Sequence, residues 1–245
     1  MKVKLTLAFD GTAYHGWQVQ QNAITVQETL QNAAEKVFGV RPGISGCSRT
    51  DSGVHALMYC CHLDIDTAIP AASLPRALNM HLPRDIVVFD AQEVLPEFHA
   101  RYSCTRKTYL YKIHNAPYRD PFSEGYTLFV HRPLNVESMN RTARDFLGAH
   151  DFSAFCSQKS KIEDKHRTVF KALVKREGNT VSFEVTADGF LYNMVRIMIG
   201  TLLTLEHKKA PEGTLTSIIE SKDRKKAGKT APPQGLYLAK VEYER

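Results

Sequence analysis

The sequence has few cysteines and no pattern that would tie them together. Five cysteines occur in 245 residues, an odd number, and no Cys-x-x-Cys pair is present. This spacing argues against a disulfide framework and against a structural zinc site. Unpaired thiols are typical of a reducing compartment, and we therefore expect a cytoplasmic protein. The cysteines stand at positions 47, 60, 61, 104 and 156.

Long hydrophobic segments are also lacking. The apolar stretch at residues 5–9 is too short for the core of a signal peptide. The longest apolar region, residues 189–205, is interrupted by Arg196 and does not read as a membrane span. The histidines show no metal-ligand spacing, and neither a P-loop nor a Rossmann glycine pattern occurs. We expect no membrane association and no metal.

What the sequence does have is an excess of basic residues. Lys and Arg number 32 against 26 Asp and Glu, which gives a net charge of +6 and a pI near 9.0. A basic balance favours polyanionic partners such as nucleic acid. The most basic stretch, residues 222–229, reads KDRKKAGK. It fits a clamp on a phosphate backbone and a solvated loop equally well.

Hydrophobic periodicity predicts alternating helices and strands. A helix is expected over residues 25–38, because Thr25 and Glu28 form a capping box and Gly39 follows as a terminator. Further helices are expected over residues 73–82, 135–147, 190–205 and 214–221. Strands are expected over residues 2–9, 40–47, 54–65, 86–94, 102–114, 167–175, 180–186 and 235–243.

This order of elements predicts an α+β fold with mainly antiparallel sheet, in two similar halves. The N-terminal half would cover residues 1–115 and the C-terminal half residues 135–245. Residues 116–134 carry three prolines and a glycine, which is typical of a crossover between halves.

The most informative loop, residues 48–53, lies between two expected strands. It packs Arg49, several hydroxyl groups and one carboxylate, Asp51, into six positions. Loops anchored by strands often hold reactive groups, and Gly53 would let the chain turn back sharply. The plainer interpretation is a hairpin loop in which Asp51 caps a turn.

Two further groups of residues favour a role in RNA chemistry. Arg101 and Arg106 are interleaved with tyrosines that include Tyr109, and aromatic side chains beside cations suit base stacking and phosphate contact. Arg196 lies within an apolar helix, where a guanidinium needs a partner such as a carboxylate. Alternatively, Arg196 falls on an exposed stripe of that helix.

Several ordered motifs resemble those of the TruA family of tRNA pseudouridine synthases. The segment R-T-D-S-G-V-H at residues 49–55 is similar to the family signature R-T-D-x-G-V-H. Residues 9–18, 100–111, 150–155, 190–196 and 231–236 resemble further family motifs in the same order. The resemblance therefore covers the whole chain. The sequence departs from many members at Ser48, Ser52 and Ile197, which puts the preferred uridines rather than the catalytic residue in doubt.

The resemblance implies an isomerase that converts uridine to pseudouridine in the anticodon stem-loop of tRNA, at family positions 38, 39 and 40. It implies two α+β halves joined around a central basic cleft, a homodimer, and no metal or organic cofactor. Asp51 would act as nucleophile or base, and Arg196 would keep it ionised. Tyr109 would stack on the extruded uracil. Arg49, Arg101 and Arg106 would bind the substrate, Arg49 by occupying the space that the flipped base vacates.

Two other functions fit parts of the sequence. A non-catalytic RNA-binding protein could use the same basic and aromatic side chains. A hydrolase could use Asp51 with a second carboxylate, such as Asp10 or Asp64, and would release free base or cut the strand. The sequence weighs against the hydrolase, because no acidic partner accompanies Asp51 in its motif.

Overall fold

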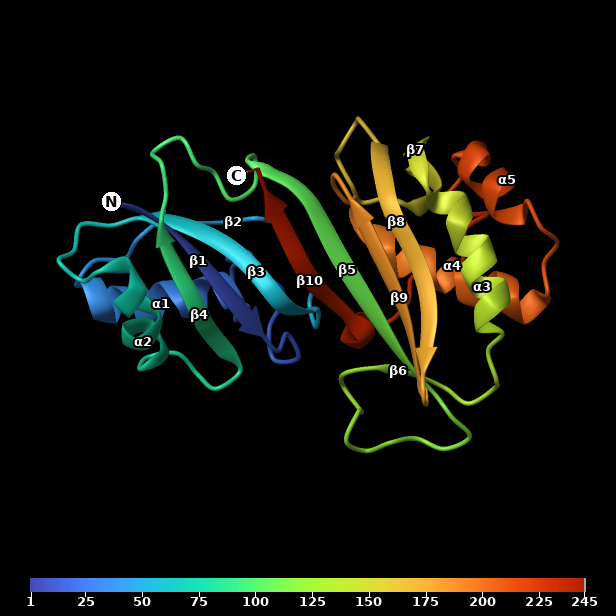
Figure 1. Cartoon of the computed structure of the whole chain (residues 1–245), viewed down its shortest axis with the longest axis horizontal. Helices are drawn as coiled ribbons and strands as arrows, with labels where there is room; N and C mark the ends of the chain where they lie inside the picture. Colours follow the sequence, from blue (N-terminus) through green and yellow to red (C-terminus); the bar gives the residue numbers. More distant parts are fainter. Residues whose placement is uncertain (245) are drawn as a thin grey trace. The chain divides into compact units, whose positions relative to one another are not determined.

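The computed structural model describes residues 1–244 of the chain. These residues divide into two compact units. Unit 1 contains residues 1–105 and the C-terminal segment from residue 237, and unit 2 contains residues 106–236. Each unit combines helices with mainly antiparallel strands (Figure 1), which confirms the predicted α+β class. The last strand therefore belongs to the same unit as the N-terminus.

The sheet of unit 1 has the strand order β4-β1-β3-β10, with β2 paired to β3. β1 is antiparallel to β3 and β4, whereas β10 runs parallel to β3. The alternation that predicted β1 is confirmed, since Val3, Leu5, Leu7 and Phe9 are all buried. The strands are β1 (Lys2–Phe9), β2 (Ile44–Gly46), β3 (His55–Asp64), β4 (Ile86–Glu93) and β10 (Leu236–Tyr243).

Two helices complete unit 1. Helix α1 (Val26–Phe38) begins as its sequence predicts, because the Thr25 hydroxyl accepts a hydrogen bond from the Glu28 N–H at 3.4 Å. It ends at Gly39, whose φ of 75° is left-handed. Helix α2 (Leu74–Asn79) follows the short 3₁₀ turn η1 (Ala71–Ser73) and packs on β4.

The sheet of unit 2 has the strand order β5-β9-β8-β7, all antiparallel, with β6 parallel to β5. The predicted hairpin is confirmed, since β8 and β9 flank the turn at Gly178, which has a φ of 57°. The short β6 lies within the predicted crossover. The strands are β5 (Cys104–Asn115), β6 (Leu128–Val130), β7 (Gly148–Asp151), β8 (His166–Glu177) and β9 (Thr180–Ala187).

The helices of unit 2 differ from the predicted ones mainly at their ends. Helix α3 (Val136–Ala143) packs on β8 and continues as the 3₁₀ turn η2 (Arg144–Phe146). Helix α4 (Met194–Lys208) begins four residues later than predicted, because Asn193 adopts a left-handed φ of 62°. Helix α5 (Thr214–Ser221) has its predicted bounds. The other 3₁₀ turns are η3 (Ser153–Phe155) and η4 (Pro233–Gly235).

Candidate active site

Asp51 lies in a tight loop of unit 1 between β2 and β3. The Val54 N–H donates to the Asp51 carbonyl oxygen at 3.2 Å and closes a turn. Gly53 inside this turn has a φ of 75°, which a glycine adopts without steric cost. Asp51 is half-buried and Arg49, two residues earlier, is exposed. The loop thus presents a carboxylate and a guanidinium close together in the chain.

A second loop, residues 10–18, holds the Asp51 loop through backbone hydrogen bonds. The Gly53 N–H donates to the Tyr14 carbonyl at 3.2 Å, and the Trp17 N–H donates to the Thr50 carbonyl at 3.4 Å. The two loops approach so closely at Gly16 that a Cβ there would lie 2.2 Å from the Thr50 carbonyl oxygen. The position of Asp51 is therefore fixed by residues more than thirty positions away in the sequence.

Side chains beneath the two loops are aromatic and tightly packed. The rings of Trp17 and Tyr59 stack with centroids 4.1 Å apart, and the Tyr59 hydroxyl donates to the Ser48 carbonyl. His55 is 2% exposed, and its Nδ1 accepts a hydrogen bond from the Gly11 N–H at 3.1 Å. These contacts connect the Asp51 loop to the sheet of unit 1.

Asp10 lies beside His55 but serves its own loop. Its Oδ1 is 3.1 Å from His55 Nδ1. Asp10 Oδ1 also accepts hydrogen bonds from the backbone N–H and the hydroxyl of Thr12, at 2.9 and 2.6 Å. This carboxylate has a local structural task, which weighs against its use as a second acid.

Arg101 is exposed on a turn that two histidines organise. The Arg101 N–H donates to His99 Nδ1 at 3.1 Å, and the Ala100 N–H donates to His62 Nδ1 at 3.1 Å. Burial, together with the neighbouring His99, lowers the pKa of His62, which favours the neutral ring that these hydrogen bonds require. The Arg101 guanidinium lies 5.7 Å from the ring of Tyr102, which is 78% exposed. A cation and an aromatic ring are thus displayed together.

In unit 2, Tyr109 and Arg106 both lie on β5. The Tyr109 ring meets Phe190 edge to face, with centroids 4.9 Å apart and an interplanar angle of 81°. The Arg106 guanidinium lies 4.3 Å from the centre of the Phe170 ring. Neither aromatic partner was predicted from the sequence, because both are contributed by segments distant from β5.

Arg196 lies in the first turn of α4, where two neighbours fix its guanidinium. Its Nε donates to the Ala231 carbonyl at 2.8 Å, and its Nη1 donates to Asn193 Oδ1 at 2.8 Å. The Ala231 N–H donates in turn to the Arg196 carbonyl at 3.0 Å. The alternative of an exposed stripe is wrong, since Arg196 is half-buried on a helix that is buried nearly all round. Burial raises the pKa of Tyr111, and the Arg196 charge opposes that rise.

The six predicted site residues are divided between the units. Unit 1 contains Arg49, Asp51 and Arg101, and unit 2 contains Arg106, Tyr109 and Arg196. The predicted pairing of Asp51 with Arg196 links residues of different units and stays a prediction. The hydrogen bond from Arg196 to Asn193 was not predicted from the sequence. The position of Asn193 three residues before Arg196, at the start of a helix, is the signal that could have indicated it.

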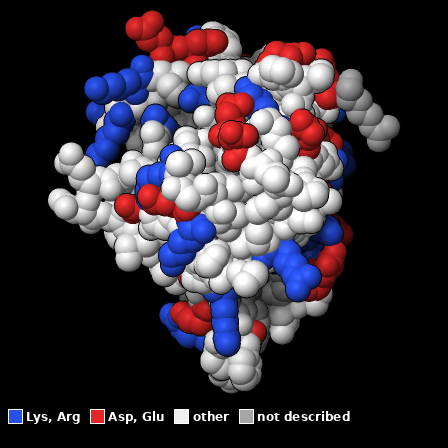
Figure 2. All heavy atoms as spheres, turned by 90° about the vertical axis from the view of Figure 1, so that its left-hand side faces the viewer, with Lys and Arg blue, Asp and Glu red and all other residues white. Residues whose placement is uncertain are grey.

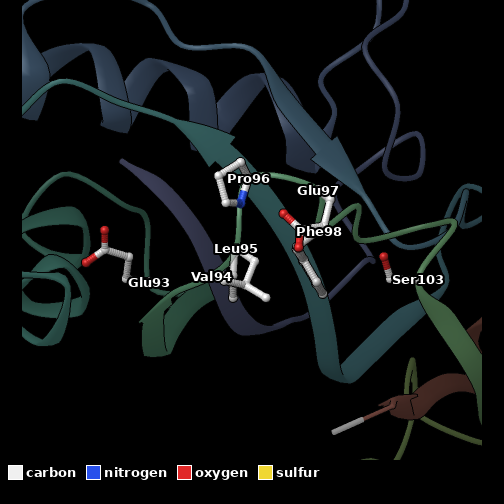
Figure 3. Close-up of a pocket in the computed structure, with 7 residues that line it drawn as sticks. All are labelled: Glu93, Val94, Leu95, Pro96, Glu97, Phe98 and Ser103. Atoms are coloured by element: carbon white, nitrogen blue, oxygen red, sulfur yellow. The ribbon is translucent and has the colours of Figure 1, made fainter.

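Other surface features of unit 1 do not compete with this site. Figure 3 shows the residues that line a pocket of unit 1, residues 93–98 and Ser103, and none of the six predicted residues is among them. Figure 2 shows one face of the molecule that carries both basic and acidic side chains. Among residues 1–244, no three His, Cys, Asp or Glu side chains gather as metal ligands.

Comparison with known proteins gives a consistent result. The sequence profile of a family described as tRNA pseudouridine synthase matches residues 6–103 and 142–244. A protein named tRNA pseudouridine synthase A from a Thermoanaerobacter species is 48% identical over 98% of this chain and 99% of its own. The Staphylococcus aureus protein of that name is 39% identical over 98% of this chain and 91% of its own. A solved Cbf5-Nop10-Gar1 complex aligns with a TM-score of 0.39 and 12% identity, over 82% of this chain and 53% of that one.

Proposed function

Because this chain belongs to the tRNA pseudouridine synthase family, we propose that it isomerises uridine to pseudouridine in tRNA with Asp51 as the essential carboxylate. The observation that carries the proposal is the near full-length similarity to proteins of that name, in which the loop around Asp51 falls within the matched residues. The anticodon arm is the proposed target, as the family resemblance implies.

The reaction breaks the glycosidic bond from ribose to a ring nitrogen of uracil and forms a bond to a ring carbon. The product is an isomer of the substrate, so no atom is gained or lost. The uridine must first leave its stack, which costs a few kcal/mol. Arg49 would enter the vacated space, since it is exposed and its planar guanidinium can stack on bases.

Asp51 would then act in its ionised form, as nucleophile or as base. Arg196 is the proposed partner that keeps Asp51 ionised. This role is supported by the hydrogen bonds to Asn193 and Ala231, which fix the orientation of the Arg196 guanidinium. Tyr109 would stack on the extruded uracil, with Phe190 supporting the ring from its side. Arg101 and Arg106 would bind phosphates or bases beside the target.

The test uses unmodified tRNA transcripts and the purified protein. Pseudouridine is mapped by chemical block to primer extension, for the wild type, Asp51→Asn and Asp64→Asn. Asp64 is an exposed carboxylate on β3 that pairs loosely with Lys2 at 3.9 Å, and its variant serves as the control. We expect new stops in the anticodon arm with the wild type and Asp64→Asn, and none with Asp51→Asn.

Each other outcome favours a different function. Binding of tRNA without any stop, in the wild type, would indicate the non-catalytic RNA-binding protein. Release of free uracil or a cut strand would indicate the hydrolase, and mass spectrometry of the product distinguishes both from an isomer of unchanged mass. Full activity in Asp51→Asn would refute the role of this carboxylate.

We further propose a cytoplasmic homodimer. Within residues 1–244 no cysteine forms a disulfide, and burial raises the pKa of the Cys60 and Cys61 thiols, so both stay protonated. Such thiols are suited to a reducing compartment. No helix within residues 1–244 has the length and apolar character needed to cross a membrane. Light scattering tests the dimer, which should have twice the 27.6 kDa of one chain.

A further inference from the structure

The basic stretch at residues 222–229, which we call the lysine loop, has a fixed conformation. It begins where α5 ends, and the Asp223 carboxylate accepts a hydrogen bond from the Lys225 N–H at 2.9 Å. The Arg224 guanidinium points into the loop and donates to the Gly228 carbonyl at 2.9 Å and to the Thr230 hydroxyl at 3.2 Å. One of the basic residues therefore serves to hold the others in place.

The lysine loop is also docked on helix α4. The Gly228 N–H donates to the Thr201 hydroxyl oxygen at 2.9 Å. A Cβ on Gly200 would lie 1.8 Å from the Lys229 carbonyl oxygen, and a Cβ on Gly228 would lie 2.6 Å from the Gly200 carbonyl oxygen. Backbones this close leave the loop little freedom to move. Lysines on it are therefore presented at defined positions.

This docking places the lysine loop beside the candidate catalytic arginine. Lys229 is followed two residues later by Ala231, whose backbone both donates to and accepts from Arg196. Two residues of chain span at most about 7 Å. A flexible lysine side chain adds to that reach, so its ammonium group can contact a molecule bound at Arg196.

The charge of the lysine loop is concentrated and only partly neutralised. It has five basic residues and one acidic residue, a net charge of +4 in a chain whose total is +6. Lys222 pairs with Asp151 at 3.1 Å. Lys225, Lys226 and Lys229 are exposed, and none of them has an ion-pair partner among residues 1–244. Like charges held within a Debye length repel one another, and a bound polyanion relieves that repulsion.

We propose that Lys225, Lys226 and Lys229 bind the phosphate backbone of the RNA segment adjacent to the uridine held at Arg196. The proposal rests on the proposed function in taking RNA as the substrate and Arg196 as part of the site that holds the uridine. Ammonium groups bind phosphates as point charges without reading bases, so the contact would contribute affinity and register rather than sequence preference. Arg224 would act through the loop and not touch the RNA.

The experiment measures tRNA affinity against salt concentration for three triple variants. K225Q/K226Q/K229Q removes the proposed contacts. K225R/K226R/K229R keeps their charge. K175Q/K208Q/K209Q is the control for net charge, because it makes the same change at exposed lysines of the same unit, although Lys175 pairs with Glu177 at 2.6 Å. Lys208 lies about 18 Å along α4 from Arg196.

We expect the glutamine variant to reduce the magnitude of the negative slope of log K against log salt by about 0.7 to 0.9 for each lost contact, so by roughly 2 to 3 for the set of three. The arginine variant and the control should keep the wild-type slope. In turnover assays the glutamine variant should raise KM, with kcat within about twofold at saturating tRNA. Thermal unfolding confirms that each variant is folded.

A slope in the glutamine variant equal to that of the control would overturn the proposal. So would a fall in kcat with KM unchanged, since that would indicate a purely structural effect on Arg196. The slope is a binding measurement and needs no product. Failure of the wild type to form pseudouridine would therefore refute the proposed function without deciding the role of the lysine loop.

Discussion

Gly16 offers a sharp test of how the Asp51 loop is held. Its φ is 83°, and a Cβ on it would lie 2.2 Å from the Thr50 carbonyl oxygen. Gly39 at the end of α1 has a similar φ of 75°, but a Cβ there would meet nothing within 4 Å. Replacing either glycine by alanine therefore imposes the same kind of backbone strain. Only Gly16→Ala adds a clash with the Asp51 loop.

The expected effects follow from these two geometries. Left-handed backbone costs an alanine about 1–2 kcal/mol, so Gly39→Ala should lose about that much stability and Gly16→Ala should lose more, because its Cβ also clashes with Thr50. Cβ atoms essentially never lie closer than 3.0 Å to such an oxygen, so in Gly16→Ala the loop at Thr50 must move by about 0.8 Å. A misplacement of about 1 Å can cost roughly 100-fold in rate. Gly39→Ala should keep the wild-type rate.

The assay is the single-turnover rate of pseudouridine formation at saturating enzyme, beside thermal unfolding of both variants. A Gly16→Ala enzyme with the wild-type rate would refute the claim that the loop at residues 10–18 positions Asp51. Equal rate losses in both variants would show that backbone strain, and not displacement of the loop, is responsible.

Three further outcomes are expected. Asn193→Gly keeps the left-handed backbone but removes the oxygen that accepts a hydrogen bond from Arg196. We expect kcat/KM to fall about tenfold, while the free energy of unfolding changes by less than about 1 kcal/mol. An unchanged kcat/KM would contradict the role of this hydrogen bond. Burial raises the pKa of Asp151, but hydrogen bonds from Ser153 and Lys222 outweigh it and bring the pKa to about 2. This value lies below the pKa of an unfolded aspartate, about 3.9, so the ionised carboxylate stabilises the folded protein at pH 7. Asp151→Asn should therefore be less stable than the wild type at pH 7. Denaturant titrations should show this difference disappearing as the pH falls towards 2. Burial lowers the pKa of His62, so the unfolded chain binds a proton more readily than the folded one below about pH 6.5, and the free energy of unfolding falls with pH there. In His62→Asn the free energy of unfolding should therefore fall less between pH 6.5 and 5 than in the wild type.

The sequence predicted best where a local signal sets the structure. Helix α1 has the predicted start and end because a side-chain cap and a left-handed glycine, Thr25 and Gly39, mark them. The strand expected over residues 40–47 was wrong in length, since the strand observed there is Ile44–Gly46. The helix expected from residue 190 was wrong at its start, because apolar periodicity continues through Asn193 while the backbone there turns left-handed.

The candidate site residues remain a prediction, and their arrangement could not be predicted at all. Asp51 was named because its motif resembles a family signature, since the composition of its loop fits a plain hairpin as well, and Arg196 because a guanidinium in an apolar helix needs a partner. The contacts that hold them could not be predicted, because they are largely backbone hydrogen bonds, such as Trp17 N–H to the Thr50 carbonyl. Any residue type can make such a bond, so the sequence carries no trace of it. For the same reason the sequence does not show that β10 belongs to unit 1, since the backbone hydrogen bonds of a strand do not depend on which residues it contains.

Asp51 and Arg196 are nevertheless positioned in the same way. In each case a backbone segment distant in the sequence packs closely against a glycine. At Gly200 the opposing atom is the Lys229 carbonyl oxygen, 1.8 Å from where a Cβ would stand. In a helix, alanine is favoured over glycine by about 1 kcal/mol, so without this contact Gly200→Ala would stabilise the protein. We expect the opposite: lower stability, and a slower reaction because Ala231 moves and loosens Arg196. Thermal unfolding and single-turnover rates measure both, and a more stable variant with the wild-type rate would show that the segment after the lysine loop does not position Arg196.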